Sequence, residues 1–118
     1  MVRYDACVGV LKVLLDRTRL RIVRALYARP HNVNELAERL HCKQFEVSRG
    51  LKWLRGVGIV EFQRFGKVHR YHLVKGIRTQ GEREVEEIDL GCCRFRLALM
   101  DDEAAIKGSM LPGVATGS

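Results

Sequence analysis

The spacing of apolar residues changes sharply near residue 59, and this change most constrains the fold. Before it, apolar residues recur every three or four positions in two runs, 33–40 and 44–55, which predicts two helices. His41-Cys42-Lys43 separates them, a connection of turn length. After it, IVEFQRF and VHRYHLV alternate in polarity on either side of Phe65-Gly66-Lys67, as the strands of a hairpin do. Two helices joined by a short turn and followed by a hairpin indicate a winged helix-turn-helix.

Two further helices are expected ahead of this unit, over 4–15 and 18–28, from the same spacing. Asp16 lies where its carboxylate can cap the second of them, and Pro30 ends it. Asn32 and Glu35 have the spacing of a capping box at the start of helix 33–40. Gly56 and Gly58 are the expected stop for helix 44–55.

The chain beyond the hairpin is harder to assign. Residues 77–87 are polar and are interpreted as a linker or weak helix, whereas IDLGCCRFRLAL, 88–99, alternates and is interpreted as a strand. The fold class expected is therefore mainly α with a β-hairpin wing, a winged helix-turn-helix with an extra C-terminal strand. We divide the chain into a DNA-binding domain at 1–75, a sensor or dimerisation segment at 76–100 and a flexible tail at 101–118.

The composition limits the class of protein. With 118 residues, 47% of them apolar, one compact domain is expected. No apolar run approaches the roughly 20 residues that cross a bilayer, so no membrane partner is expected. Asp5, Lys12 and Asp16 interrupt the N-terminal apolar stretch and disfavour a signal peptide. We therefore expect a soluble cytoplasmic protein.

Charge is distributed unevenly along the chain. Residues 1–75 carry 16 Lys and Arg against 6 Asp and Glu, whereas residues 76–118 carry 5 against 8. A strongly basic body suggests a polyanionic partner, and with the predicted fold that partner is double-stranded DNA. The sequence has no Ser/His/Asp set, paired carboxylates or phosphate loop, so an enzyme is not expected.

The second helix of the motif should present one face to the core and another to DNA. Phe45, Val47, Leu51 and Leu54 are predicted to face inward. Gln44 and Arg49 can make bidentate contacts to bases, and the basic residues suit phosphates. The full predicted DNA-binding set comprises Lys43, Gln44, Glu46, Ser48, Arg49, Lys52, Arg64, Lys67, His69 and Arg70.

The segments LLDRTRLRIVRAL, VNELAERL and QFEVSRGLKWLRGVGIVEFQRFGKVHRYHL together resemble the ArsR/SmtB family of winged-helix repressors over roughly residues 10–74. The resemblance implies a homodimeric repressor that leaves its operator when an inducer binds, often a metal or metalloid ion. It places the recognition helix at 44–55 and the wing at 60–73. We expect helix 4–15 to supply much of the dimer interface.

Three positions depart from the family pattern. Members often have a capping Ser where this chain has Lys43, which cannot cap and whose charge opposes the helix dipole. Members commonly have His where this chain has Gly50, so any contact made by that His is lost. The family usually follows the wing with a helix, whereas this chain continues with a polar segment and the predicted strand 88–99.

Four cysteines are present, and we expect them to be reduced in a cytosolic protein. Cys92 and Cys93 are adjacent, and adjacent thiols suit soft ions such as As(III), Sb(III), Hg(II) or Cu(I). Cys7 is the preferred third ligand, although a core role for it is equally compatible with the sequence, and Cys42 is interpreted as a core thiol. Neighbouring strand residues point to opposite faces, so both sulfurs could share one ion only if Gly91 relaxes the backbone.

Alternatives stay open at this point. The thiols could sense oxidants or persulfides instead of ions. The winged helix could be a protein-interaction module, although the basic helix and wing disfavour this. Among the other residues, His31 is expected to be solvated, and Trp53 and Tyr71 are expected to pack within the fold.

Overall fold

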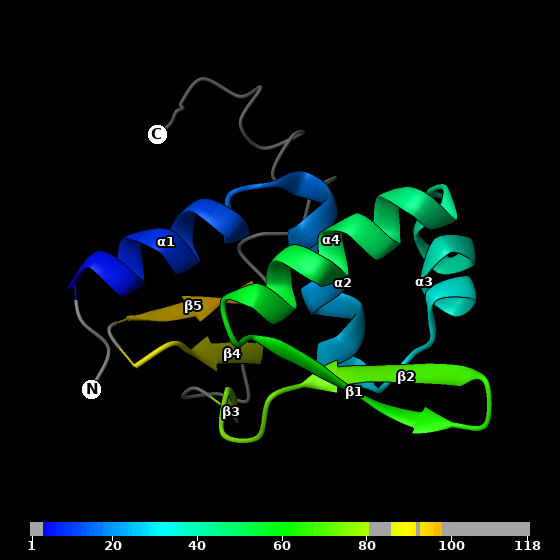
Figure 1. Cartoon of the computed structure of the whole chain (residues 1–118). Coiled ribbons are helices and arrows are strands. Elements are labelled where there is room, and N and C mark those ends of the chain that lie inside the picture. Colours follow the sequence, from blue (N-terminus) through cyan, green and yellow to red (C-terminus); the bar gives the residue numbers. More distant parts are fainter. Residues whose placement is uncertain (1–3, 81–85, 92, 98–118) are drawn as a thin grey trace.

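The computed structural model describes residues 4–80, 86–91 and 93–97, which form four helices and five strands (Figure 1). The helices are α1 (Tyr4–Leu14), α2 (Arg17–Ala28), α3 (Val33–Leu40) and α4 (Gln44–Gly56). The strands are β1 (Val60–Phe65), β2 (Val68–Leu73), β3 (Arg78–Gln80), β4 (Glu86–Asp89) and β5 (Arg94–Arg96). This confirms the winged helix-turn-helix, with α3 and α4 as the motif and β1–β2 as the wing.

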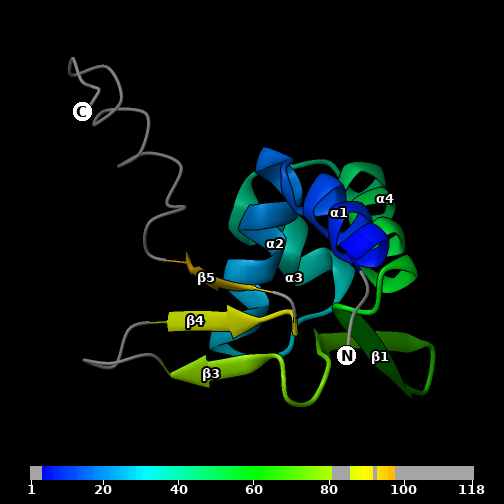
Figure 2. The ribbon, with the colours of Figure 1, turned by 90° about the vertical axis from the view of Figure 1, so that its left-hand side faces the viewer.

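The strands form two separate antiparallel sheets, and Figure 1 shows both below the helices, with the wing toward the right. In the wing, β1 and β2 pair from Val60 opposite Leu73 to Phe65 opposite Val68 at the tip. The second sheet has the order β3-β4-β5, with Ile88 of β4 opposite Arg78 on one side and Phe95 on the other. Figure 2 shows this sheet beside α2, away from the wing.

Helix boundaries follow the predicted caps. The Asp16 carboxylate accepts a hydrogen bond from the Arg19 backbone N–H at 3.0 Å. The capping box of α3 is complete, with Glu35 N–H donating to Asn32 Oδ1 at 2.8 Å and Asn32 N–H donating to Glu35 Oε1 at 2.9 Å. The second of these bonds holds the pKa of Glu35 below its ordinary value, because it favours the ionised carboxylate. His41 ends α3 in the left-handed conformation, at φ 55°.

One hydrophobic core joins all four helices to both sheets. Ile22 and Leu36 are fully buried at its centre, together with Leu51 of α4. Ile88 of β4 and Leu97, which follows β5, are equally buried and belong to the same core. The three-stranded sheet is therefore packed onto the helical body, where it contacts α1 and α2, rather than suspended beyond it.

The prediction of a single strand at 88–99 is wrong. The chain reverses at Gly91, which adopts φ 91°, and two strands replace the single one, with Ile88 in β4 and Phe95 in β5. The segment interpreted as linker or weak helix contributes β3 and the start of β4. Strands of three or four residues are too short to show a convincing period, and a glycine in the left-handed region marks the turn instead. The predicted tail, 101–118, lies outside the described residues.

Candidate DNA-binding surface and cysteine pair

Helix α4 has the two faces that the sequence predicts, with one exception. Val47, Leu51 and Leu54 are buried against the rest of the core. Phe45, predicted to face inward, is 59% exposed, so that prediction is wrong. Its apolar character misled the prediction, because residue 45 precedes Val47 by two positions, about 200° around an α-helix, and therefore lies opposite the buried face.

The close packing of α4 on α2 explains the glycine that departs from the family pattern. Gly50 is buried, and a Cβ built on it would lie 2.9 Å from Ile22 Cδ1. A larger side chain at this position would therefore require the Ile22 side chain of α2 to shift. Within the described chain the Lys43 side chain makes no capping hydrogen bond to α4, as its chemistry predicts.

The predicted DNA-contacting residues lie mostly on the surface of α4 and the wing. Glu46 and His69 are half-buried. The others are exposed, namely Lys43, Gln44, Ser48, Arg49, Lys52, Arg64, Lys67 and Arg70. The six on or next to α4 share one helix and its N-cap, and the four on the wing surround its tip. Their roles in DNA binding stay predictions.

Two of the α4 side chains are positioned by neighbours. The Gln44 amide donates a hydrogen bond to Asn34 Oδ1 of α3, which ties the start of α4 to the preceding helix. The Arg49 guanidinium lies over the Phe45 ring, 5.6 Å from its centroid. Neither contact was predicted from the sequence, although the four-residue spacing of Phe45 and Arg49 signals such a pair.

The wing carries both basic and aromatic side chains. His69 stacks on Phe62 with ring centroids 4.3 Å apart, and Arg64 Nε donates to His69 Nε2 at 3.4 Å. His69 is therefore held against its own strand pair rather than extended outward. Phe65 and Val68, which face each other at the tip, are both exposed. The tip of the wing therefore carries two apolar side chains, with basic side chains around them.

His31 anchors the wing, contrary to the expectation that it is solvated. It is 1% exposed, and its backbone pairs with that of Tyr71 in β2 through hydrogen bonds of 3.1 and 2.8 Å. Its Nδ1–H donates to the Arg29 carbonyl at 2.8 Å, whereas Nε2 is buried with no partner among the described residues. Burial lowers the pKa of His31, because the charged ring would lose its hydration.

The second candidate site is a pair of sulfurs between α1 and the three-stranded sheet. Cys7 Sγ of α1 lies 4.0 Å from Cys93 Sγ, across 86 positions of sequence. Cys7 is 8% exposed and Cys93 is half-buried. Cys7 is disulfide-bonded, which contradicts the expectation that every cysteine is reduced, whereas Cys93 and Cys42 carry thiols. Cys92 lies outside the described residues.

Cys42 belongs to a different part of the molecule. Its Sγ donates to the Leu40 carbonyl at 3.4 Å and lies 3.9 Å from Arg21 Nη1. Arg21 Nη2 also donates to the Leu40 carbonyl at 2.8 Å. These contacts fix the turn between α3 and α4, in keeping with the predicted structural role of Cys42.

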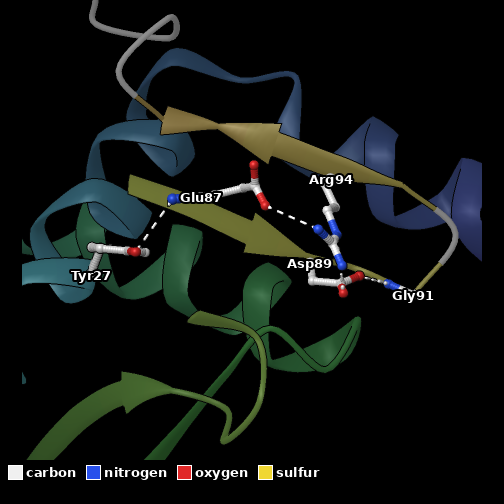
Figure 3. Close-up of polar contacts among 5 residues, drawn as sticks. All are labelled: Tyr27, Glu87, Asp89, Gly91 and Arg94. Carbon is white, nitrogen blue, oxygen red and sulfur yellow. Dashed lines mark hydrogen bonds and ion pairs between the residues drawn. The ribbon is translucent and has the colours of Figure 1, made fainter. Parts of the chain in front are cut away.

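Charged groups shape the hairpin that carries Cys93, as Figure 3 shows. The Arg94 guanidinium contacts Glu87 at 3.6 Å and Asp89 at 3.5 Å, so it bridges β4 and β5. Asp89 Oδ1 accepts from the Gly91 N–H at 2.8 Å, which supports the turn. The Glu87 backbone N–H donates to the Tyr27 hydroxyl at 3.3 Å, joining β4 to α2 (Figure 3).

The described part of the chain holds no group of three His, Cys, Asp or Glu side chains placed to bind a metal ion. The predicted ion site of Cys7, Cys92 and Cys93 is therefore represented only by Cys7 and Cys93, whose sulfurs the fold brings together. Of the described helices, none is both long and apolar enough to cross a membrane.

Residues 16–61 match the family model described as bacterial regulatory protein, arsR family. Among solved structures, the reduced form of HlyU from Vibrio cholerae has 31% sequence identity and a TM-score of 0.57, covering 60% of this chain and 75% of that one. The transcriptional repressor BigR from Xylella fastidiosa has 32% identity and a TM-score of 0.56, covering 60% and 70%. The homodimeric winged helix-turn-helix DNA-binding domain of Mb0332 from Mycobacterium bovis has 28% identity and a TM-score of 0.56, covering 58% and 64%. Comparison with curated proteins gives no match.

Proposed function

Since the chain belongs to the ArsR family of DNA-binding transcriptional regulators, we propose that it is a homodimeric repressor controlled by the chemistry of its cysteines. The observation that carries the proposal is the approach of Cys7 Sγ to within 4.0 Å of Cys93 Sγ. This contact links α1 to the C-terminal sheet, at a site distinct from α4 and the wing.

The arrangement of basic side chains supports operator binding through α4 and the wing. A recognition helix reads base edges with its N-terminal residues, and here that end presents Gln44 and Arg49. Lys52, Lys67 and Arg70 are exposed around it and suit phosphate contacts, which supply affinity without sequence information. Regulators of this family are not enzymes, and the role proposed here needs no catalytic group.

Helix α1 supports the proposal of a dimer. Leu15, which follows α1, is 68% exposed, and Val8, Val10 and Leu11 are only half-buried within one protomer. A second copy would cover this apolar surface. One recognition helix reads only a few base pairs, so a dimer that presents two helices roughly 34 Å apart should bind an imperfect palindrome.

Oxidation is the form of control that the cysteines support best. Cys7 is disulfide-bonded, and we propose Cys92 as its partner because Cys92 directly precedes Cys93, whose sulfur neighbours Cys7. Conversion of two thiols to a disulfide releases two electrons and two protons, which hydrogen peroxide accepts to form two waters. Cys93, half-buried beside this bond, is a third thiol that can exchange with it. One of the similar structures is the reduced form of HlyU from V. cholerae, so the redox state of the cysteines is worth testing in this chain as well.

Binding of a thiophilic ion is the second candidate, favoured by one distance. When one ion binds two thiolates in tetrahedral geometry, with each ion–sulfur distance roughly 2.3 Å, the two sulfurs lie about 3.8 Å apart. The 4.0 Å between Cys7 Sγ and Cys93 Sγ is close to that separation. In this reading, reduced Cys7, Cys92 and Cys93 would hold As(III), Sb(III), Hg(II) or Cu(I) as the inducer.

A mobility-shift titration distinguishes these forms of control. The probe is a duplex selected by the reduced protein from a random-sequence DNA pool, and the additions are peroxide, a polysulfide, As(III), Hg(II), Cu(I) and Zn(II). Release by peroxide alone supports oxidation, and release by an ion under reducing, anaerobic conditions supports the second candidate. Selective release by the polysulfide indicates persulfide sensing.

Serine variants locate the sensor in the same assay. Cys92→Ser should keep DNA binding and lose release under either form of control, and Cys93→Ser should lose it only if an ion is the inducer, whereas Cys42→Ser is the matched control and should release normally. Cys7→Ser should lose release if its sulfur takes part in the reaction. If the double variant Cys92→Ser, Cys93→Ser releases DNA at the wild-type inducer concentration, the cysteines are structural and the proposed control is wrong.

A further inference from the structure

The first turn of α4 carries an exposed aromatic ring that the DNA-contacting set predicted from the sequence does not include. Phe45 is the second residue of the helix and is 59% exposed, although a phenyl ring gains free energy from burial. The side chains around it on the helix, Gln44, Ser48 and Arg49, are exposed and polar or basic. An exposed phenyl ring among polar and basic side chains is suited to bind a partner whose surface is mostly polar but includes an apolar group.

Major-groove DNA is such a partner. Each thymine presents a 5-methyl group there, and phenylalanine is among the residues that contact it. The N-terminal residues of a recognition helix are those that meet base edges, which is where Phe45 lies. Charge complementarity favours the same partner, because Lys43, Arg49 and Lys52 are exposed along the same helix and its N-cap.

The contact with Arg49 restricts what Phe45 can read. The guanidinium lies 5.6 Å from the centre of the ring, so the two side chains form one unit. Arginine reads guanine through O6 and N7, and stacked bases along a strand are about 3.4 Å apart. A separation of 5.6 Å therefore places the two contacts on neighbouring base pairs rather than several steps apart.

We propose that Phe45 and Arg49 together read a thymine next to a guanine in each half-site, Phe45 through the thymine 5-methyl group and Arg49 through the guanine edge. The proposal deepens the proposed function and rests on its assignment of α4 to the major groove. It adds a specificity-determining residue whose contribution is apolar rather than a hydrogen bond.

Uracil substitution tests the apolar contact, because uracil differs from thymine only by the missing methyl group. The reduced protein first selects duplexes from a random-sequence pool, and each thymine of the selected site is then replaced by uracil in turn. At one thymine per half-site, beside a guanine, the wild-type Kd should rise about fourfold, the effect expected for one buried methyl group. Phe45→Ala should bind the thymine and uracil duplexes equally.

Trp53→Ala is the matched control. Trp53 is another exposed aromatic residue of α4, 55% exposed and paired with Arg19 at 5.8 Å, but it lies two turns beyond the reading end. This variant should keep the fourfold thymine preference. Replacing the neighbouring guanine by 7-deazaguanine should weaken binding by the wild type and not by Arg49→Ala, because N7 is one of the two acceptors that arginine uses.

Four results decide between the proposal and its alternatives. The proposal is supported if Phe45→Ala loses the thymine preference while Trp53→Ala keeps it. A wild-type protein that binds every uracil duplex like its thymine counterpart overturns it, as does a Phe45→Ala variant with the preference unchanged. Failure to select any duplex overturns the DNA-binding assignment of α4 itself, which is a distinguishable outcome.

Discussion

The α4–wing region and the sheet that carries Cys93 are stabilised in different ways. Helices α3 and α4 have eight and thirteen residues, and a complete capping box starts α3. The three-stranded sheet has strands of three or four residues, held by distant partners such as Tyr27 of α2 and Cys7 of α1. An element that depends on a few long-range contacts opens more easily than one with dense local contacts. The comparison suggests that the first region presents a fixed reading surface and the second is the part that can respond.

The largest effect should follow from removing the core contact that joins the two regions. Ile88 of β4 is fully buried in the core shared with the helices. Ile88→Ala should lower the free energy of unfolding by about 2–5 kcal/mol, the usual range for a truncated core isoleucine. Urea denaturation of the reduced protein, followed by tryptophan fluorescence from Trp53, measures this change on the helical side.

The matched control is Arg96→Ala in β5, an exposed position where a change within about 0.5 kcal/mol is expected. If Ile88→Ala left the transition reported by Trp53 unchanged, the sheet would be energetically separate from the helix-turn-helix. The proposed route from cysteine to DNA would then lose its physical basis.

Long elements with local signals could be predicted from the sequence, and short ones could not. The capping box of Asn32 and Glu35 and the carboxylate cap of Asp16 are contacts over three residues, so their spacing is visible in the chain. Cys7 and Cys93 are neighbours although they are 86 positions apart in sequence, and the position of Cys93 after a reversal at Gly91 has no periodic signal. The burial of His31 likewise depends on packing in three dimensions, whereas the exposure of Phe45 follows from its place on the helix opposite Val47.

A smaller effect, of opposite sign, is expected at the start of α4. Lys43 makes no capping bond there, and a serine at an N-cap stabilises a helix by about 1 kcal/mol relative to a residue that cannot cap. Lys43→Ser should therefore raise the free energy of unfolding while lowering affinity for all DNA sequences. Lys43→Ala separates the two effects, because it loses the charge without gaining a cap. Equal stability of the serine and alanine variants would show that the cap does not form.

The smallest effect concerns pH and the anchor of the wing. Burial lowers the pKa of His31 from 6.5, so below that pH the unfolded chain binds a proton that the folded chain resists. The stability contributed by neutral His31 is thus complete above pH 6.5 and falls as the pH drops below it. Unfolding free energies at pH 7.5 and 5.5 should differ more in the wild type than in His31→Gln. An identical pH dependence in both proteins would contradict this account of His31.

The central claim is that the state of the cysteines and the occupancy of α4 by DNA are coupled. Coupling between two sites is reciprocal, so DNA must shift the redox equilibrium by the same free energy by which oxidation weakens DNA binding. The most direct measurement is the midpoint potential of the Cys7 disulfide in a Cys42→Ser background, with and without saturating selected duplex. If the reduced protein binds DNA about tenfold more tightly, DNA should raise that potential by about 30 mV. A potential that DNA leaves unchanged would contradict the account, because the cysteines and the DNA-binding surface would then be independent.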